Sequence, residues 1–124
     1  MNLRTTLTLG MLLMAGSVAL GAFGAHAFKE SLLASGRTET FELAIRYLMF
    51  HSLALILLGY LMEKFPGLRT AVVFLLAGIF FFCGSLLVLA LADQPVWGAV
   101  APIGGTALIV GWLMAAWTVY KSKS

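Results

Sequence analysis

Charged residues are scarce in this sequence. Only five acidic and eight basic side chains occur among 124 residues. Charged residues therefore make up 10% of the chain, whereas an average soluble domain contains about 25%. Apolar residues account for 61% of the chain, which is too many for an intrinsically disordered protein. The composition thus excludes both an ordinary soluble domain and a disordered chain.

Cysteine is represented by a single residue, Cys83, so no disulfide can form within the chain. This excludes a small secreted scaffold held together by disulfides. A lone thiol within an apolar helix usually serves only packing. The class that remains is a small integral membrane protein, and residues 1–124 form one transmembrane domain without a linker.

Four apolar runs have the length of about 20 residues that a helix needs to cross a hydrocarbon core of roughly 30 Å. These runs cover residues 7–27, 43–62, 71–92 and 96–120. Strands of a membrane barrel alternate between apolar and polar residues, and these runs do not. The sequence predicts an all-α membrane protein, a four-helix bundle whose short loops make neighbouring helices antiparallel.

The first apolar run also resembles a signal peptide, because Ala25-His26-Ala27 is a small-residue cleavage pattern. However, the run is about 20 residues long, and the apolar core of a signal peptide usually has 7–15. We therefore expect a retained transmembrane helix.

The basic residues indicate an orientation, since cytoplasmic loops of membrane proteins are enriched in lysine and arginine. With four spans, the N-terminus, the middle loop and the C-terminus share one side. That side carries Arg4, Lys64, Arg69, Lys121 and Lys123, and the other side carries Lys29, Arg37 and Arg46. Both termini are predicted to be cytoplasmic. We interpret the net charge of +3 as topology and contact with the lipid bilayer, not as nucleic-acid binding.

Small residues at intervals of four predict where helices pack, because helices in lipid associate through close contact over such residues. One stripe lies in the first run, one in the fourth, and a notch lies in the third. Their members are Ser17, Gly21 and Ala25; Ala107, Gly111 and Ala115; and Gly78, Gly84 and Ser85. A large residue at Gly21 or Gly111 is expected to disrupt assembly.

His51 is the most deeply placed ionisable residue, roughly 12 Å below Leu43 at about 1.5 Å per residue. Tyr47 precedes it by four residues and so shares its helix face. An ionisable group inside the membrane marks a candidate site. Three interpretations remain open: a structural hydrogen bond, proton or ligand handling, and ligation of a metal or haem.

No metal site is expected, because metal ions usually require three or four ligands and the chain has two histidines and one cysteine. A haem bound by two histidines would need His26 and His51 at similar depth, and the predicted spans place them roughly 10 Å apart.

Two further patterns concern the ends of the spans. Glu42 and Arg46 are four residues apart and predict an ion pair near the outer surface.

The segment Pro102-Ile103-Gly104-Gly105 near the start of the fourth run has two interpretations. Pro102 either lies in a first helical turn with glycines that permit close packing, or the segment is unwound and offers backbone groups to a ligand.

The sequence contains no catalytic triad, no paired carboxylates and no phosphate-binding glycine loop, so we expect no enzyme and no cofactor. The leading hypothesis is a structural or accessory membrane protein, alone or with a homo-oligomer or another membrane partner. The alternatives are a small-solute or proton-coupled carrier that acts as an oligomer and, more weakly, a subunit that binds haem or quinone.

Several short motifs carry a family likeness across nearly the whole chain. In order, they are Gly21-Ala22-Phe23-Gly24-Ala25-His26, Tyr47 with His51-Ser52-Leu53-Ala54-Leu55, Gly84-Ser85-Leu86, Pro102-Ile103-Gly104-Gly105 and Gly111-Trp112. Together they resemble the domain of unknown function 423 family of small bacterial inner-membrane proteins, which is related to eukaryotic transmembrane protein 256.

The resemblance implies four helices and a bacterial inner-membrane location, but it carries no established activity. It draws attention to one candidate polar cluster, formed by His26, Tyr47, His51, Ser85, Pro102, Gly104 and Gly105. The chain departs from the family pattern at Leu48, Leu87 and Ala101, where the family has polar residues. Because polar groups are absent at these three positions, the sequence does not favour a shared catalytic network.

Overall fold

The computed structural model describes residues 1–123, and within them every regular element is helical. Four segments are long and apolar enough to cross a membrane: Leu3–Ala27, Thr38–Leu61, Leu68–Ala92 and Pro95–Lys121. The prediction of four spans in an all-α chain is therefore confirmed. Each span begins earlier than the apolar run, because helices extend into the polar residues that flank the hydrocarbon region, as at Thr38.

The spans are built from several helical elements, some with irregular turns. The first span joins α1 (Leu3–Ala19), the π-helical turn η1 (Leu20–Gly24) and α2 (Ala25–Ala27), and the second is α4 (Thr38–Leu61). The third span joins α5 (Leu68–Gly78), the π-helical turn η2 (Ile79–Cys83) and α6 (Gly84–Ala92). The fourth joins the 3-10 helix η3 (Pro95–Ala99) and α7 (Ala101–Lys121). A short helix, α3 (Lys29–Ser35), connects the first two spans.

Local sequence signals explain where these helices begin and end. The side chain of Asn2 caps α1 by accepting a hydrogen bond from the Thr5 amide at 2.8 Å. Gly36 ends α3 in the left-handed conformation (φ 71°), which glycine adopts without steric cost. Asp93 ends α6 in the same region (φ 51°).

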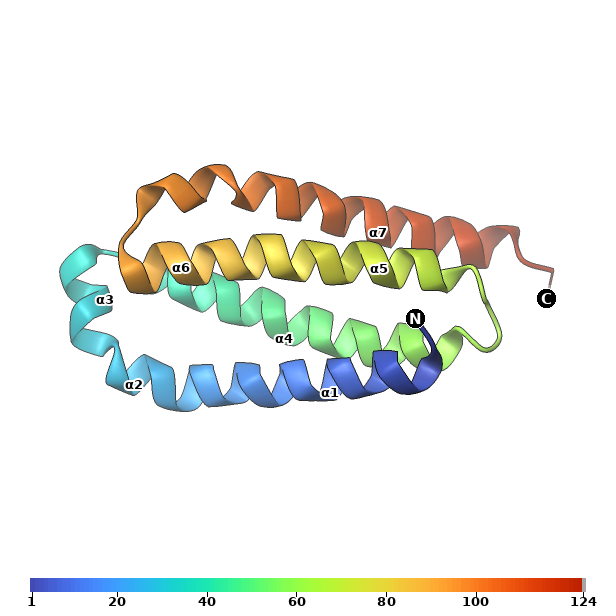
Figure 1. Ribbon diagram of the computed structural model, residues 1–124, viewed down its shortest axis with the longest axis horizontal. Coiled ribbons are helices and arrows are strands. Elements are labelled where there is room, and N and C mark those ends of the chain that lie inside the picture. Colours follow the sequence, from blue (N-terminus) through green and yellow to red (C-terminus); the bar gives the residue numbers. More distant parts are fainter. Residues whose placement is uncertain (124) are drawn as a thin grey trace.

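The four spans lie side by side, and the two chain ends are at the same end of the molecule (Figure 1). α1 packs mainly against α4, and α7 packs mainly against α5 and η2. α4 also contacts α5, η2 and α6, so the second and third spans lie between the first and the fourth. The small-residue stripes of the first and fourth spans therefore serve different interfaces.

The packing seam of the first span differs from the predicted stripe. The buried residues of α1 and η1 are Thr6, Gly10, Ser17 and Gly24. Of the predicted stripe, Ser17 is buried, Gly21 is half-buried, and Ala25 is exposed. A step of four residues rotates about 40° around a helix, whereas a step of seven drifts only about 20°. The seam follows steps of seven after Gly10, so the prediction at Ala25 was wrong.

The seam of the fourth span advances in steps of three and four. Its buried residues are Ala101, Gly104, Leu108, Gly111 and Ala115, whereas Ala107 is only half-buried. A Cβ added at Gly111 would lie 2.9 Å from a methyl carbon of Leu75, so this glycine is needed for contact with α5. A Cβ added at Gly84 would meet nothing within 4 Å, so the predicted packing role of Gly84 was wrong.

Three buried hydroxyl groups in the spans donate hydrogen bonds to backbone oxygens three or four residues earlier. Thr6, Ser17 and Ser52 donate to the carbonyl oxygens of Asn2, Met14 and Leu48 at 2.6–2.8 Å. In hydrocarbon, an unsatisfied polar group costs several kcal/mol, so this local bonding permits burial without a partner on another helix.

Candidate functional site

His51 lies near the middle of α4 and is buried, with 7% of its surface exposed. Its Nδ1 lies 2.8 Å from the backbone oxygen of Tyr47, and the indole nitrogen of Trp112 on α7 lies 3.0 Å from its Nε2. A carbonyl oxygen only accepts a hydrogen bond, and an indole N–H only donates one. Both contacts are therefore satisfied by one species, the neutral imidazole with its proton on Nδ1.

Aromatic rings surround this hydrogen-bonded pair. The Tyr47 ring stacks on His51 with centroids 5.9 Å apart and meets the Phe82 ring at 4.8 Å. The Trp112 ring lies 5.9 Å from His51. Tyr47 and His51 share a face of α4, Phe82 comes from η2, and Trp112 comes from α7. The second, third and fourth spans thus meet at one aromatic cluster, which we call the His51 cluster.

Close contact between α7 and η2 helps to assemble this cluster. A Cβ added at Gly104 would lie less than 3.0 Å from backbone atoms of Phe81 and Phe82, a separation that real Cβ atoms do not show. Glycine therefore lets the two backbones touch. The π-helical turn η2 lies at this contact, and the ring of Phe82 extends from it to Tyr47. α7 is a continuous helix from Ala101 to Lys121, with Pro102 in its first turn, as the packing interpretation predicts.

A pocket of about 300 Å³ opens beside the His51 cluster. Its lining residues are Tyr47, His51, Phe82, Gly105, Leu108, Ile109 and Trp112. The pocket wall is mostly apolar, and both nitrogens of the His51 imidazole already have protein partners. Among residues 1–123, no group of three or more histidine, cysteine, aspartate or glutamate side chains lies together to hold a metal ion.

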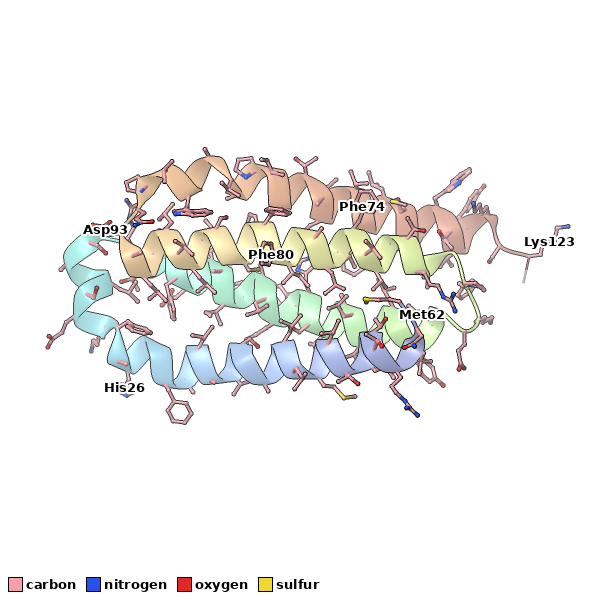
Figure 2. The ribbon with its side chains drawn as sticks, viewed as in Figure 1. His26, Met62, Phe74, Phe80, Asp93 and Lys123 are labelled. Atoms are coloured by element: carbon pink, nitrogen blue, oxygen red, sulfur yellow. The ribbon has the colours of Figure 1, made fainter. Side chains whose placement is uncertain are left out.

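The predicted polar cluster is only partly assembled. Tyr47, His51 and Gly105 line the same pocket, and Gly104 packs against η2 beside it. His26 is exposed at the end of the first span, where its side chain points away from the other helices (Figure 2). The hydroxyl of Ser85 donates to the Phe82 carbonyl oxygen at 3.1 Å, and Pro102 is exposed. His26 and His51 therefore do not share a haem site.

Sequence reasoning missed Phe82 and the role of Trp112. Tryptophan in membrane proteins usually lies at the interface with water, where its N–H reaches a polar group. Trp112 is instead about two-thirds of the way along the fourth span, well inside both of its ends. A tryptophan at this depth needs an internal acceptor, and this is the signal that could have linked it to His51.

The ion pair predicted between Glu42 and Arg46 was wrong. Within residues 1–123, the one salt bridge joins Nε of Arg37 to a carboxylate oxygen of Asp93 at 3.3 Å. It connects the start of the second span to the end of the third, a contact that spacing along one helix cannot reveal. Glu42 and Arg46 are both exposed and line a groove beside Phe41.

Comparison with known proteins places these features in a family. The family described as "Protein of unknown function (DUF423)" matches residues 20–105. A UPF0382 membrane protein of Staphylococcus haemolyticus is 40% identical over 91% of this chain and 93% of its own length. The UPF0382 inner membrane protein YgdD of Escherichia coli is 36% identical over 78% of this chain and 75% of its own. No solved structure matches the chain.

Proposed function

Because the chain belongs to the DUF423 family and is a multi-pass protein of the bacterial inner membrane, we propose that it is a non-enzymatic membrane protein with a structural or accessory role. In this proposal, the His51 cluster holds the second and fourth spans together. The membrane location, the resemblance to the family and the four spans predicted from sequence are confirmed.

One observation carries the proposal: both nitrogens of the His51 imidazole are used within the protein. In this arrangement Nε2 has no free lone pair for a metal ion. A proton could reach Nε2 only after the bond from Trp112 breaks. A hydrogen bond between membrane helices contributes about 0.6 to 1.7 kcal/mol. His51 therefore stabilises the packing of the second and fourth spans, and neither ring nitrogen is free to bind a ligand.

The proposal includes an arrangement in the membrane. The four spans form a bundle with antiparallel neighbours, and the end that carries both termini faces the cytoplasm. The larger number of lysines and arginines at that end supports this orientation. The lipid bilayer is the solvent of the bundle, and a second copy or another membrane protein would complete an accessory role.

Native mass spectrometry of the protein released from a gentle detergent tests the structural role, since it keeps bound molecules attached. We expect the wild-type protein and His51→Ala to carry the same set of bound lipids. The variant should also unfold at a lower temperature. A stoichiometric non-lipid molecule that the wild-type protein retains and His51→Ala loses would contradict the proposal.

The alternative is a small-solute or proton-coupled carrier that acts as an oligomer, and the pocket beside His51 is the observation in its favour. It predicts uptake into proteoliposomes that depends on His51. The variant His51→Gln keeps a polar side chain but cannot reproduce the imidazole. Uptake by the wild-type protein that this variant abolishes would favour the carrier over the structural role.

A further inference from the structure

Two adjoining pockets form one groove at the end of the molecule opposite the chain termini. The first, of about 240 Å³, is lined by Ala25, Lys29, Leu32, Leu33, Thr38, Phe41 and Glu42. The second, of about 350 Å³, is lined by Gly21, Ala25, Phe41, Glu42, Ile45, Arg46 and Met49. Because they share Ala25, Phe41 and Glu42, we treat them as a single feature, the α3–α4 groove.

The α3–α4 groove contains polar groups that have no partner among the described residues. Lys29, Glu42 and Arg46 line it, and within residues 1–123 none of the three takes part in a salt bridge. The hydroxyl oxygen of Thr38, which also lines the groove, is buried and has no hydrogen-bond partner among the described residues. Two cations and one carboxylate thus remain available to a bound molecule.

The deeper part of the α3–α4 groove is apolar. Ile45 and Met49 form one wall, and the buried ring of Phe41 forms the floor. The opposite wall includes Gly21 of η1, where a Cβ would only reach ordinary contact with Ile45 at 3.5 Å. Because Gly21 and Ala25 carry small or no side chains, this side of the groove is shallow, and a hydrocarbon chain would lie over Ile45 and Met49 on the outer face of the bundle.

The order of these groups along α4 matches the order of groups in a membrane lipid. Thr38 lies at the first turn of α4, Glu42 one turn further and Arg46 another turn further, with Met49 beyond them. Polar groups therefore lie toward the helix end, and apolar groups lie toward the middle of the membrane. Arginine close to a helix end also extends its charge back toward the interface.

We propose that the α3–α4 groove binds a phospholipid whose headgroup carries both a phosphate and a primary ammonium group. Lys29 and Arg46 donate hydrogen bonds to the phosphate oxygens. Glu42 accepts hydrogen bonds from the ammonium group, which has three donors. One acyl chain lies along Ile45 and Met49. This site is separate from the His51 cluster and does not depend on its role.

The charges that line the α3–α4 groove favour a phosphatidylethanolamine headgroup over two other common headgroups. A phosphatidylglycerol headgroup would satisfy the two cations but would leave Glu42 beside an anion. A phosphatidylcholine headgroup has a cation that cannot donate a hydrogen bond to Glu42. Phosphatidylethanolamine satisfies all three charges. A hydrogen bond to a charged group is strong enough to change affinity about tenfold.

The test uses the full-length protein in detergent, with phosphatidylethanolamine, phosphatidylcholine and phosphatidylglycerol of identical acyl chains added in equal amounts. Native mass spectrometry then measures how much of each lipid stays bound. We expect the wild-type protein to retain one phosphatidylethanolamine with a preference of about tenfold. The variant Glu42→Gln should lose the preference over phosphatidylcholine. The variant Arg46→Gln should weaken retention of all three lipids.

Matched controls lie at the opposite end of the molecule, where Glu63→Gln and Arg69→Gln remove exposed charges of the same kinds. They should leave the lipid preference unchanged. Lys29→Gln provides a second test of phosphate binding if Arg46→Gln does not fold. Equal retention of the three lipids, a preference that survives Glu42→Gln, or a second copy of the chain bound in place of lipid would overturn the proposal.

Discussion

The His51 cluster and the α3–α4 groove share one sequence pattern, but only in the His51 cluster does the ionisable side chain find partners among the residues that the structure describes. In each, two polar residues are spaced by four on α4: Tyr47 with His51, and Glu42 with Arg46. His51 finds partners on its own helix and on α7. Glu42 and Arg46 form no salt bridge within residues 1–123. The same spacing of four therefore occurs in a buried hydrogen-bonded cluster in one region and beside an open groove in the other.

The neighbouring helices account for this difference. His51 faces α7, where Trp112 presents a donor at the required depth. Beside Glu42 and Arg46, the first span presents Gly21 and Ala25, which have no polar side-chain atoms. In addition, the groove lies at a helix end, where lipid headgroups and water are within reach. An unpaired charge near a helix end therefore costs less free energy than an unpaired charge near the middle of a membrane.

The largest expected effect concerns the backbone contact that assembles the His51 cluster. Gly104→Ala places a methyl group against the backbone of η2, which cannot move as a flexible side chain can. We expect a loss of about 1–3 kcal/mol or more, measured as a lower unfolding temperature in detergent. Gly84→Ala is the matched control, because its methyl group meets nothing within 4 Å. Equal destabilisation by both variants would show that the Gly104 contact is unimportant.

Removal of the imidazole should have the next largest effect. His51→Ala leaves the indole N–H of Trp112 without its acceptor and opens a space among the aromatic rings. We expect a loss of about 1–2 kcal/mol in the free energy of unfolding, measured by titration with a denaturing detergent. Unchanged stability would mean that His51 does not hold the second and fourth spans together, and would contradict the proposed structural role.

A double-mutant cycle isolates the bond between the second and fourth spans. Trp112→Phe removes the donor but keeps an aromatic ring, and His51→Ala removes the acceptor. The two changes should be less than additive by about 0.6–1.7 kcal/mol, the range for hydrogen bonds between membrane helices. The same titration measures the single and double variants. Strict additivity would mean that the bond contributes nothing to stability.

The smallest expected effect belongs to the α3–α4 groove. Glu42→Gln removes a charge that has no salt-bridge partner among the described residues, so the free energy of unfolding should change by less than about 0.5 kcal/mol. The same titration, at fixed lipid content, provides the measurement. A loss as large as that from His51→Ala would show that Glu42 is paired within the protein after all.

Local signals made much of the fold predictable. Four apolar runs were sufficient to identify four spans, because a helix that crosses lipid satisfies its backbone hydrogen bonds within its own segment. The end of α3 at Gly36 was predictable for a similar reason, since a left-handed cap depends on one residue. The position of His51 near the middle of α4 followed from its place within the second apolar run.

Contacts between helices were less predictable. The stripe from Ser17 to Ala25 was placed correctly at Ser17 but was wrong at Ala25, because small angular errors accumulate along a helix. Trp112 lies 61 residues after His51, and no spacing rule links the two. The salt bridge between Arg37 and Asp93 spans a similar separation, 56 residues.

The sequence by itself determined that the chain is helical, that it has four segments long and apolar enough to cross a membrane, and where each polar residue lies along those segments. These properties depend on hydrophobicity and backbone bonding within single segments. Tertiary structure alone decided which polar residues find partners, because a partner lies on another helix and its position depends on how the helices pack. It joined His51 to Trp112 and left Glu42 and Arg46 facing a groove.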